Sequence, residues 1–109
     1  MNILLVEDDY LLGRSTARLL EKKGKHRVRL TRKAADIFKH CQSGLIELVI
    51  MDVNLPGTVW QEQEVTGIEL SRLLKSQPQT ARLPVLLLST NAANVNPRHL
   101  LLESGATGI

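Results

Sequence analysis

Three short runs of apolar residues divide the chain, at positions 3–6, 48–51 and 85–88. Each run is four residues long and contains no polar side chain. Such runs are typical of strands buried on both faces, as in a parallel sheet that helices cover on each side. A stretch at 26–31 alternates instead, with Val28 and Leu30 on one face. This alternation predicts a strand nearer the edge of the sheet.

Between these strands, apolar residues recur at the spacing of helices. Four such stripes lie at residues 11–20, 34–41, 68–74 and 97–102. In the first, Leu11, Leu12, Leu19 and Leu20 form the stripe that we expect to be buried. A fifth strand is expected to begin near Gly108. Strands that alternate with helices in this way predict an α/β fold with right-handed crossovers.

Polar side chains follow three of the predicted strands directly. They are Glu7, Asp8 and Asp9 after the first run, Asp52 after the second, and Ser89 and Thr90 after the third. The carboxyl ends of parallel strands meet at one edge of a sheet, so these side chains are expected to share a pocket. Clustered carboxylates without Cys or His favour a hard cation, and Mg²⁺ is the physiological choice. A carboxylate beside Mg²⁺, with a hydroxyl across the pocket, is suited to accept a phosphoryl group.

Each of these residues also has a purely structural interpretation. Acids that follow a strand often cap the next helix, and we favour that role for Asp9. For Glu7 and Asp8 taken alone, capping and metal binding stay equally open. Ser89 alone is explained by a hydrogen bond to the backbone. Asp52 is hard to explain as a cap, because it ends a fully apolar strand.

The chain resembles the receiver domain of two-component response regulators. The matching stretches are residues 3–9, 48–57, 67–70, 83–89 and 105–108. Their order and spacing make the match specific, and the resemblance covers most of residues 1–109, taken as one domain. It implies a flavodoxin-like, doubly wound parallel sheet with strand order 2-1-3-4-5.

The resemblance also implies roles for the acidic residues. Asp52 matches the aspartate that takes a phosphoryl group from a histidine kinase or phosphotransfer protein. Asp8 matches the acid that binds Mg²⁺ directly, and Glu7 matches the neighbour that reaches the ion through water. Asn54 lies where a backbone carbonyl completes the metal site.

Two hydroxyl residues belong to the same implied site. Ser89 matches the hydroxyl that contacts the phosphoryl oxygens and moves on activation. Thr90 follows it, where the family favours small residues, and is expected to hinder access to the phosphate. The implied function is a phosphoacceptor switch of a partner interaction, not a conventional enzyme.

The chain departs from the family in the segment 58–66, a loop insertion that carries Trp60, Glu62 and Glu64. We expect an extra helical turn or a solvated loop there. The alternative is a flap that contacts a partner through Trp60.

A second departure concerns the carboxyl-terminal end of the pattern. Ile109 occupies the position at which the family has its signalling aromatic residue. The family's lysine and last helix would come after this position. The fifth strand is therefore expected to be cut short and the last helix absent. A fragment of a longer protein is the favoured explanation, ahead of a shortened domain that relies on a partner. An uncovered sheet face would also favour a homodimer.

Two alternatives to the receiver function remain. The first is a pseudo-receiver, a protein-interaction module that does not use phosphorylation; the missing lysine and aromatic favour it. The second is a phosphohydrolase of the same topology. It fits less well, because such enzymes carry an acid/base aspartate at the position of Asn54.

Charge and composition limit the kinds of partner that we expect for this chain. The net charge is +3, and nine of the 14 basic residues fall between Arg14 and Lys33. A solvated helix face explains this cluster, and docking of the kinase on Arg14, Arg18 and Lys22 is the functional alternative. The sequence contains no recognition-helix motif and no interleaved aromatic residues, so we expect no direct contact with nucleic acid. No apolar run approaches the roughly 20 residues of a membrane helix. The single cysteine, Cys41, suits a reducing cytoplasm.

Overall fold

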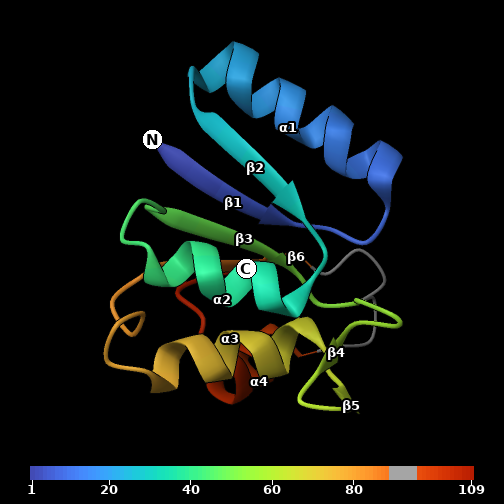
Figure 1. The fold of residues 1–109 in the computed structure, drawn as a ribbon, viewed down its shortest axis with the longest axis vertical. Helices are drawn as coiled ribbons and strands as arrows, with labels where there is room; N and C mark the ends of the chain where they lie inside the picture. The colour runs from blue at the N-terminus through green and yellow to red at the C-terminus, as the bar shows by residue number, and fades with distance from the viewer. Residues whose placement is uncertain (89–95) are drawn as a thin grey trace.

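The computed structural model describes residues 1–88 and 96–109, and its centre is a four-stranded parallel sheet (Figure 1). The strands are β1 (Asn2–Val6), β2 (Arg27–Thr31), β3 (Leu48–Asp52) and β6 (Val85–Leu88), in the order β2-β1-β3-β6. A parallel bridge between Leu86 and Gly108 adds the start of a further strand beside β6. The predicted α/β fold and strand order are confirmed.

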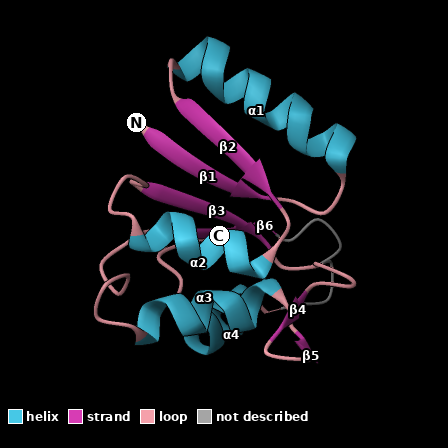
Figure 2. Cartoon of the chain, in the orientation of Figure 1, coloured by secondary structure: helices cyan, strands magenta, loops and turns pink. Residues whose placement is uncertain are grey.

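Helices cover both faces of this sheet (Figure 2). They are α1 (Tyr10–Gly24), α2 (Ala34–Gln42), α3 (Gly67–Ser76) and α4 (Pro97–Ser104). The main core lies between the sheet and α2, α3 and α4, and it is aliphatic except for Phe38 and the half-buried Trp60. In β1, Leu4 and Val6 belong to this core, whereas Leu5 pairs with Leu30 on the face that α1 covers. Among the described helices, none is long and apolar enough to cross a lipid bilayer.

Local capping explains where the helices begin. The Asp9 carboxylate accepts a hydrogen bond from the Leu12 N–H at 3.1 Å and caps α1, which confirms the role favoured for Asp9. Thr66 and Glu69 form a reciprocal capping box at the start of α3. Pro97 occupies the first turn of α4, where its missing N–H costs nothing.

The predicted buried stripe of α1 is wrong. Leu11, Leu12 and Leu19 are 78%, 44% and 60% exposed, and the buried residues of this helix are Gly13 and Ala17. Small residues let the helix approach β2 closely, because a Cβ at Gly13 would lie 2.7 Å from a methyl carbon of Leu30. Helical spacing identified the element but not the face that packs on the sheet.

The insertion 58–66 forms an antiparallel hairpin of β4 (Val59–Trp60) and β5 (Gln63–Glu64). Residues 59 and 61–64 are exposed, as expected for a solvated loop, but the segment forms a short hairpin and not a helical turn. Gln61 and Glu62 make the two-residue connection with φ of 51° and 67°, the left-handed geometry that suits such hairpins. The Trp60 ring lies 4.4 Å from the Phe38 ring, centroid to centroid. The hairpin thus packs on the core through Trp60, and contact of this residue with a partner stays a prediction.

Candidate functional site

The acidic site (Glu7, Asp8 and Asp52) lies at the carboxyl ends of two neighbouring strands. β1 and β3 pair in parallel with Val6 opposite Met51, so Glu7 and Asp52 leave the sheet side by side. Both side chains are buried, each residue being only 5% exposed, while Asp8 is half-buried. The expectation that these acids converge is thus met by the two buried carboxylates.

Backbone hydrogen bonds hold both buried carboxylates in place. Glu7 Oε2 accepts from the N–H groups of Asp8 at 2.9 Å and Asp9 at 3.4 Å. Asp52 Oδ1 accepts from the Asn54 N–H at 3.1 Å. The Val53 N–H donates to the Leu88 carbonyl at 2.9 Å and ties the end of β3 to β6. The positions of these carboxylates are therefore set by the backbone around them.

The proximity of the two buried acids changes the titration of Glu7. Burial, followed by a hydrogen bond and charge repulsion from Asp52, raises the pKa of Glu7 from 4.5 to about 7, although the N–H groups of Asp9 and Asp8 oppose the shift. Two carboxylates in one buried pocket resist ionising together. The pair needs either a shared proton or a cation near neutral pH.

The oxygen donors of this site suit Mg²⁺ in their chemistry. The raised pKa of Glu7 marks negative charge that a divalent cation would neutralise. As they stand, however, no three Asp, Glu, His or Cys side chains of the described chain are grouped closely enough to hold an ion. Binding therefore requires a side chain to move, and Asp8 is the least buried member of the set.

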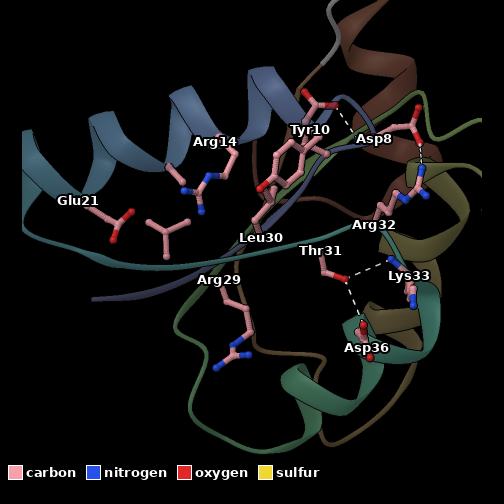
Figure 3. A pocket seen from close by; sticks show the side chains of 13 residues that line it. Asp8, Tyr10, Arg14, Glu21, Arg29, Leu30, Thr31, Arg32, Lys33 and Asp36 are labelled. Atoms are coloured by element: carbon pink, nitrogen blue, oxygen red, sulfur yellow. Dashed lines mark hydrogen bonds and ion pairs between the residues drawn. The ribbon is translucent and has the colours of Figure 1, made fainter.

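Arg32 contacts Asp8 and was not identified from the sequence. Its Nη1 lies 3.7 Å from Asp8 Oδ1 (Figure 3). Arg32 directly follows β2, which neighbours β1 in the sheet, so its place at the same edge was available from the strand-end argument. It was passed over because it lies within the run of basic residues assigned to the surface. Among the described residues, Arg32 is the only cationic residue that forms an ion pair with an acid of this site.

The remaining candidates divide into three groups. Asn54 lies beside Asp52 and donates its N–H to Asp52 Oδ1, and a role of its carbonyl in a metal site stays a prediction. Ser89 and Thr90 lie outside the described residues. Arg14 and Arg18 are exposed on α1, as is Lys22, and Arg14 lines a cavity of about 770 Å³ between α1 and β2 that also reaches Asp8 (Figure 3).

We expect Glu7→Gln to stabilise the metal-free protein increasingly as the pH rises from 4.5 to about 7. Between pH 4.5 and about 7 the native state keeps a proton on Glu7 that the unfolded chain has released, so native stability falls as the pH rises through this window. The neutral glutamine avoids that loss. The free energy of unfolding should rise by about 1–2 kcal/mol at about pH 8 and stay unchanged near pH 4, allowing for solvent screening.

Urea unfolding in EDTA, followed by circular dichroism, measures this difference. Glu62→Gln, at an exposed position of the hairpin turn, is the matched control and should show no gain at either pH. An equal gain for Glu7→Gln at both pH values would contradict the assigned charge repulsion.

Comparisons with known proteins agree with this geometry. The family model described as the response regulator receiver domain matches residues 3–109. The chain is 32% identical over 106 residues to the gliding motility regulatory protein of Myxococcus xanthus, covering 97% of this chain and 12% of that protein. It is 29% identical over 109 residues to response regulator UvrY of Escherichia coli, covering 99% of this chain and 45% of that protein. The chain thus spans less than half the length of these relatives.

Solved structures show the same fold. The non-phosphorylated HemR receiver domain from Leptospira biflexa matches with a TM-score of 0.75 at 28% identity, over 98% of this chain and 77% of that one. The receiver domain of the sensor histidine kinase PA1611 from Pseudomonas aeruginosa, which has magnesium coordinated in its active site cleft, matches with a TM-score of 0.74 at 22% identity, over 98% of this chain and 80% of that one. Receiver domains are signalling modules of two-component systems and not classical enzymes. With its parallel sheet, its strand-end carboxylates and a family match from residue 3 to residue 109, the chain belongs to the response regulator receiver domain family.

Proposed function

We propose that Asp52 accepts a phosphoryl group from the phosphohistidine of a histidine kinase or phosphotransfer protein, and that this modification switches a partner interaction. The observation that carries the proposal is the placement of the Asp52 carboxylate. It ends the central strand β3, lies beside the buried Glu7 and has one oxygen held by the Asn54 N–H. A fixed carboxylate at a strand end is a positioned nucleophile.

In the proposed reaction, a carboxylate oxygen of Asp52 attacks the phosphorus atom of phosphohistidine. The new O–P bond forms an acyl phosphate while the P–N bond breaks, and its electron pair returns to the imidazole of the donor. The Asn54 N–H holds Oδ1 and thereby orients the attacking carboxylate. Attack requires ionised Asp52. In the metal-free protein the raised pKa of Glu7 lets Glu7 hold the proton of the pair, and Mg²⁺, when bound, would take the place of that proton.

Glu7, Asp8 and Asp52, together with the Asn54 carbonyl, are the residues proposed to hold Mg²⁺. When bound, the ion neutralises charge between these carboxylates and the phosphoryl oxygens. Ser89 is proposed to contact the phosphoryl group, and Thr90 to limit access to it. The exposed Arg14, Arg18 and Lys22 of α1 support docking of the donor, and the single buried Cys41 suits a reducing cytoplasm.

Acetyl phosphate with Mg²⁺, followed by intact mass spectrometry, tests the proposal. The wild-type chain should gain one phosphoryl group, and Asp52→Asn or excess EDTA should abolish the gain. Glu62→Gln removes an exposed carboxylate of the hairpin turn and should keep it. A gain that persists in Asp52→Asn would contradict the assignment of the acceptor.

The pseudo-receiver is the second candidate, and one feature of the site favours it. The Arg32–Asp8 ion pair and the proton held by Glu7 offset two of the three acidic charges without a metal. Such an offset is what a domain that never binds Mg²⁺ requires. Absence of any phosphoryl gain in wild type, under conditions where the chain is folded, would support this alternative.

A further inference from the structure

Arg32 forms a selective contact in a strongly basic region. Nine lysine and arginine residues fall between Arg14 and Lys33. Within residues 1–88 and 96–109, Arg32 is the only lysine or arginine whose side chain forms an ion pair with a carboxylate, and that carboxylate belongs to Asp8 (Figure 3). The contact therefore singles out a proposed metal ligand.

The backbone that carries Arg32 is held from both sides. On one side, the Glu7 N–H donates to the Thr31 carbonyl at 3.1 Å, which ties the end of β2 to the acidic site. On the other, the buried Thr58 hydroxyl donates to the Arg32 carbonyl at 3.4 Å. Thr58 belongs to the insertion that forms the hairpin, so the inserted segment contributes to the position of Arg32. The backbone of Arg32 is thus held at this edge of the sheet, from which its side chain reaches Asp8.

The ion pair also explains why the three acids are not assembled. Glu7 and Asp52 are buried next to each other, whereas the Asp8 side chain is 29% exposed and directed at Arg32. No group of three potential ligand side chains occurs in the described part of the chain. For Asp8 to join the other two acids, its contact with Arg32 must break.

We propose that Arg32 is a cation that competes with Mg²⁺ for Asp8; this inference rests on the magnesium site of the proposed function. Arg32 is a positioning residue, because it acts through Asp8 and not on the phosphoryl group. Binding of Mg²⁺ breaks the ion pair and leaves the guanidinium close to a second positive charge. Arg32 thereby raises the Mg²⁺ concentration at which the site fills, and it links filling of the site to the β2–α2 connection beside Thr58.

The size of the effect follows from the exposure of the pair. The Arg32 side chain is 67% exposed, and exposed ion pairs change equilibria by about twofold to fivefold. Repulsion between the guanidinium and the bound ion acts in the same direction. Arg32→Gln should therefore lower the Kd for Mg²⁺ by about threefold to tenfold.

Isothermal titration of the full chain with magnesium chloride, at about pH 8 and low salt, measures this change. Arg29→Gln is the matched control: it removes the same charge from an exposed arginine of β2 that forms no ion pair with Asp8. Its Kd should stay within about twofold of wild type. Circular dichroism checks that each variant is folded. We expect both variants to fold, because both arginine side chains are exposed.

A nitrogen-15 NMR titration supplies a direct second measurement. The Nε–Hε signal of Arg32, assigned by its loss in Arg32→Gln, should shift with added Mg²⁺ along the same curve as the calorimetric binding. The signal of Arg29 should stay in place. A signal of Arg32 that does not respond while Mg²⁺ binds would overturn the competition.

The calorimetric outcomes separate this inference from the proposed function. If wild type binds Mg²⁺, Asp8→Asn weakens binding and Arg32→Gln leaves the Kd unchanged or higher, the competition is wrong and the magnesium site stands. If Arg29→Gln tightens binding as much as Arg32→Gln, the effect belongs to net charge and the inference also fails. If neither wild type nor Arg32→Gln binds Mg²⁺, the proposed site and this inference fail together.

Discussion

Replacing Gly67 with alanine should lower the free energy of unfolding by about 3 kcal/mol or more. A Cβ at this position would overlap the carbonyl oxygen of Asp52 and come within 2.8 Å of its carbonyl carbon and 3.0 Å of the Val53 Cα. These are backbone atoms of the last residue of β3 and of the residue that follows it, so they cannot rotate aside. The Gly67 N–H also donates to the Val53 carbonyl at 3.0 Å. The first turn of α3 therefore rests directly on the strand end that carries Asp52.

Gly13→Ala is the matched control for Gly67→Ala. Both glycines lie in helices, but a Cβ at Gly13 meets the flexible end of Leu30, at 2.7 and 3.0 Å from its methyl carbons. Rotation of Leu30 relieves this contact, and alanine adds helix propensity of about 1 kcal/mol, so the net change should stay within about 1 kcal/mol.

Urea unfolding of both variants, followed by circular dichroism, gives the comparison. Equal losses for the two variants would show that backbone contact at Gly67 is not the cause. Since the displaced backbone belongs to Asp52, folded Gly67→Ala should also gain less phosphoryl group from acetyl phosphate than wild type.

Phe38→Ala should cost about 3–4 kcal/mol of unfolding free energy and expose Trp60 to water. Phe38 is buried in α2, and its ring lies 4.4 Å from the ring of Trp60 at a tilt of 39°. Removal of the ring leaves a cavity and takes away the partner on which the hairpin packs. The chain contains a single tryptophan, so a red shift of its fluorescence reports the hairpin alone.

Phe38→Leu separates volume from aromatic contact. Leucine fills most of the cavity, and the expected cost falls to about 1 kcal/mol with little change in the emission of Trp60. If Phe38→Ala lost stability without any red shift, Trp60 would be held by other contacts. The hairpin would then not depend on the aromatic pair.

The strands were predictable because their pattern is local, whereas their order was implied by the resemblance to receiver domains. Runs such as 3–6 and 85–88 are apolar on both faces, and only a covered parallel sheet hides such strands from water. The packing face of α1 was not predictable in this way. Four leucines at helical spacing marked the helix, but in the structure the small residues Gly13 and Ala17 are the buried ones, with Gly13 beside Leu30. Steric fit between elements distant in sequence leaves no mark in the periodicity of one element.

The hairpin was missed for a related reason. Its turn uses Gln61 and Glu62 in the left-handed region, where glycine or asparagine is the usual signal. Each strand is two residues long, too short for alternation to be read. Packing of Trp60 on Phe38, 22 positions earlier in the chain, compensates for this weak local preference.

The sequence by itself determined the strand-end carboxylates Glu7, Asp8 and Asp52, because a residue that follows a buried parallel strand emerges at the same edge of the sheet as its neighbours. Only the tertiary structure decided how these acids differ. Burial of Glu7 against Asp52 raises its pKa to about 7, while Asp8 turns toward Arg32 at 3.7 Å. Desolvation and ion pairing depend on distances between residues far apart in the chain, and the fold alone sets those distances.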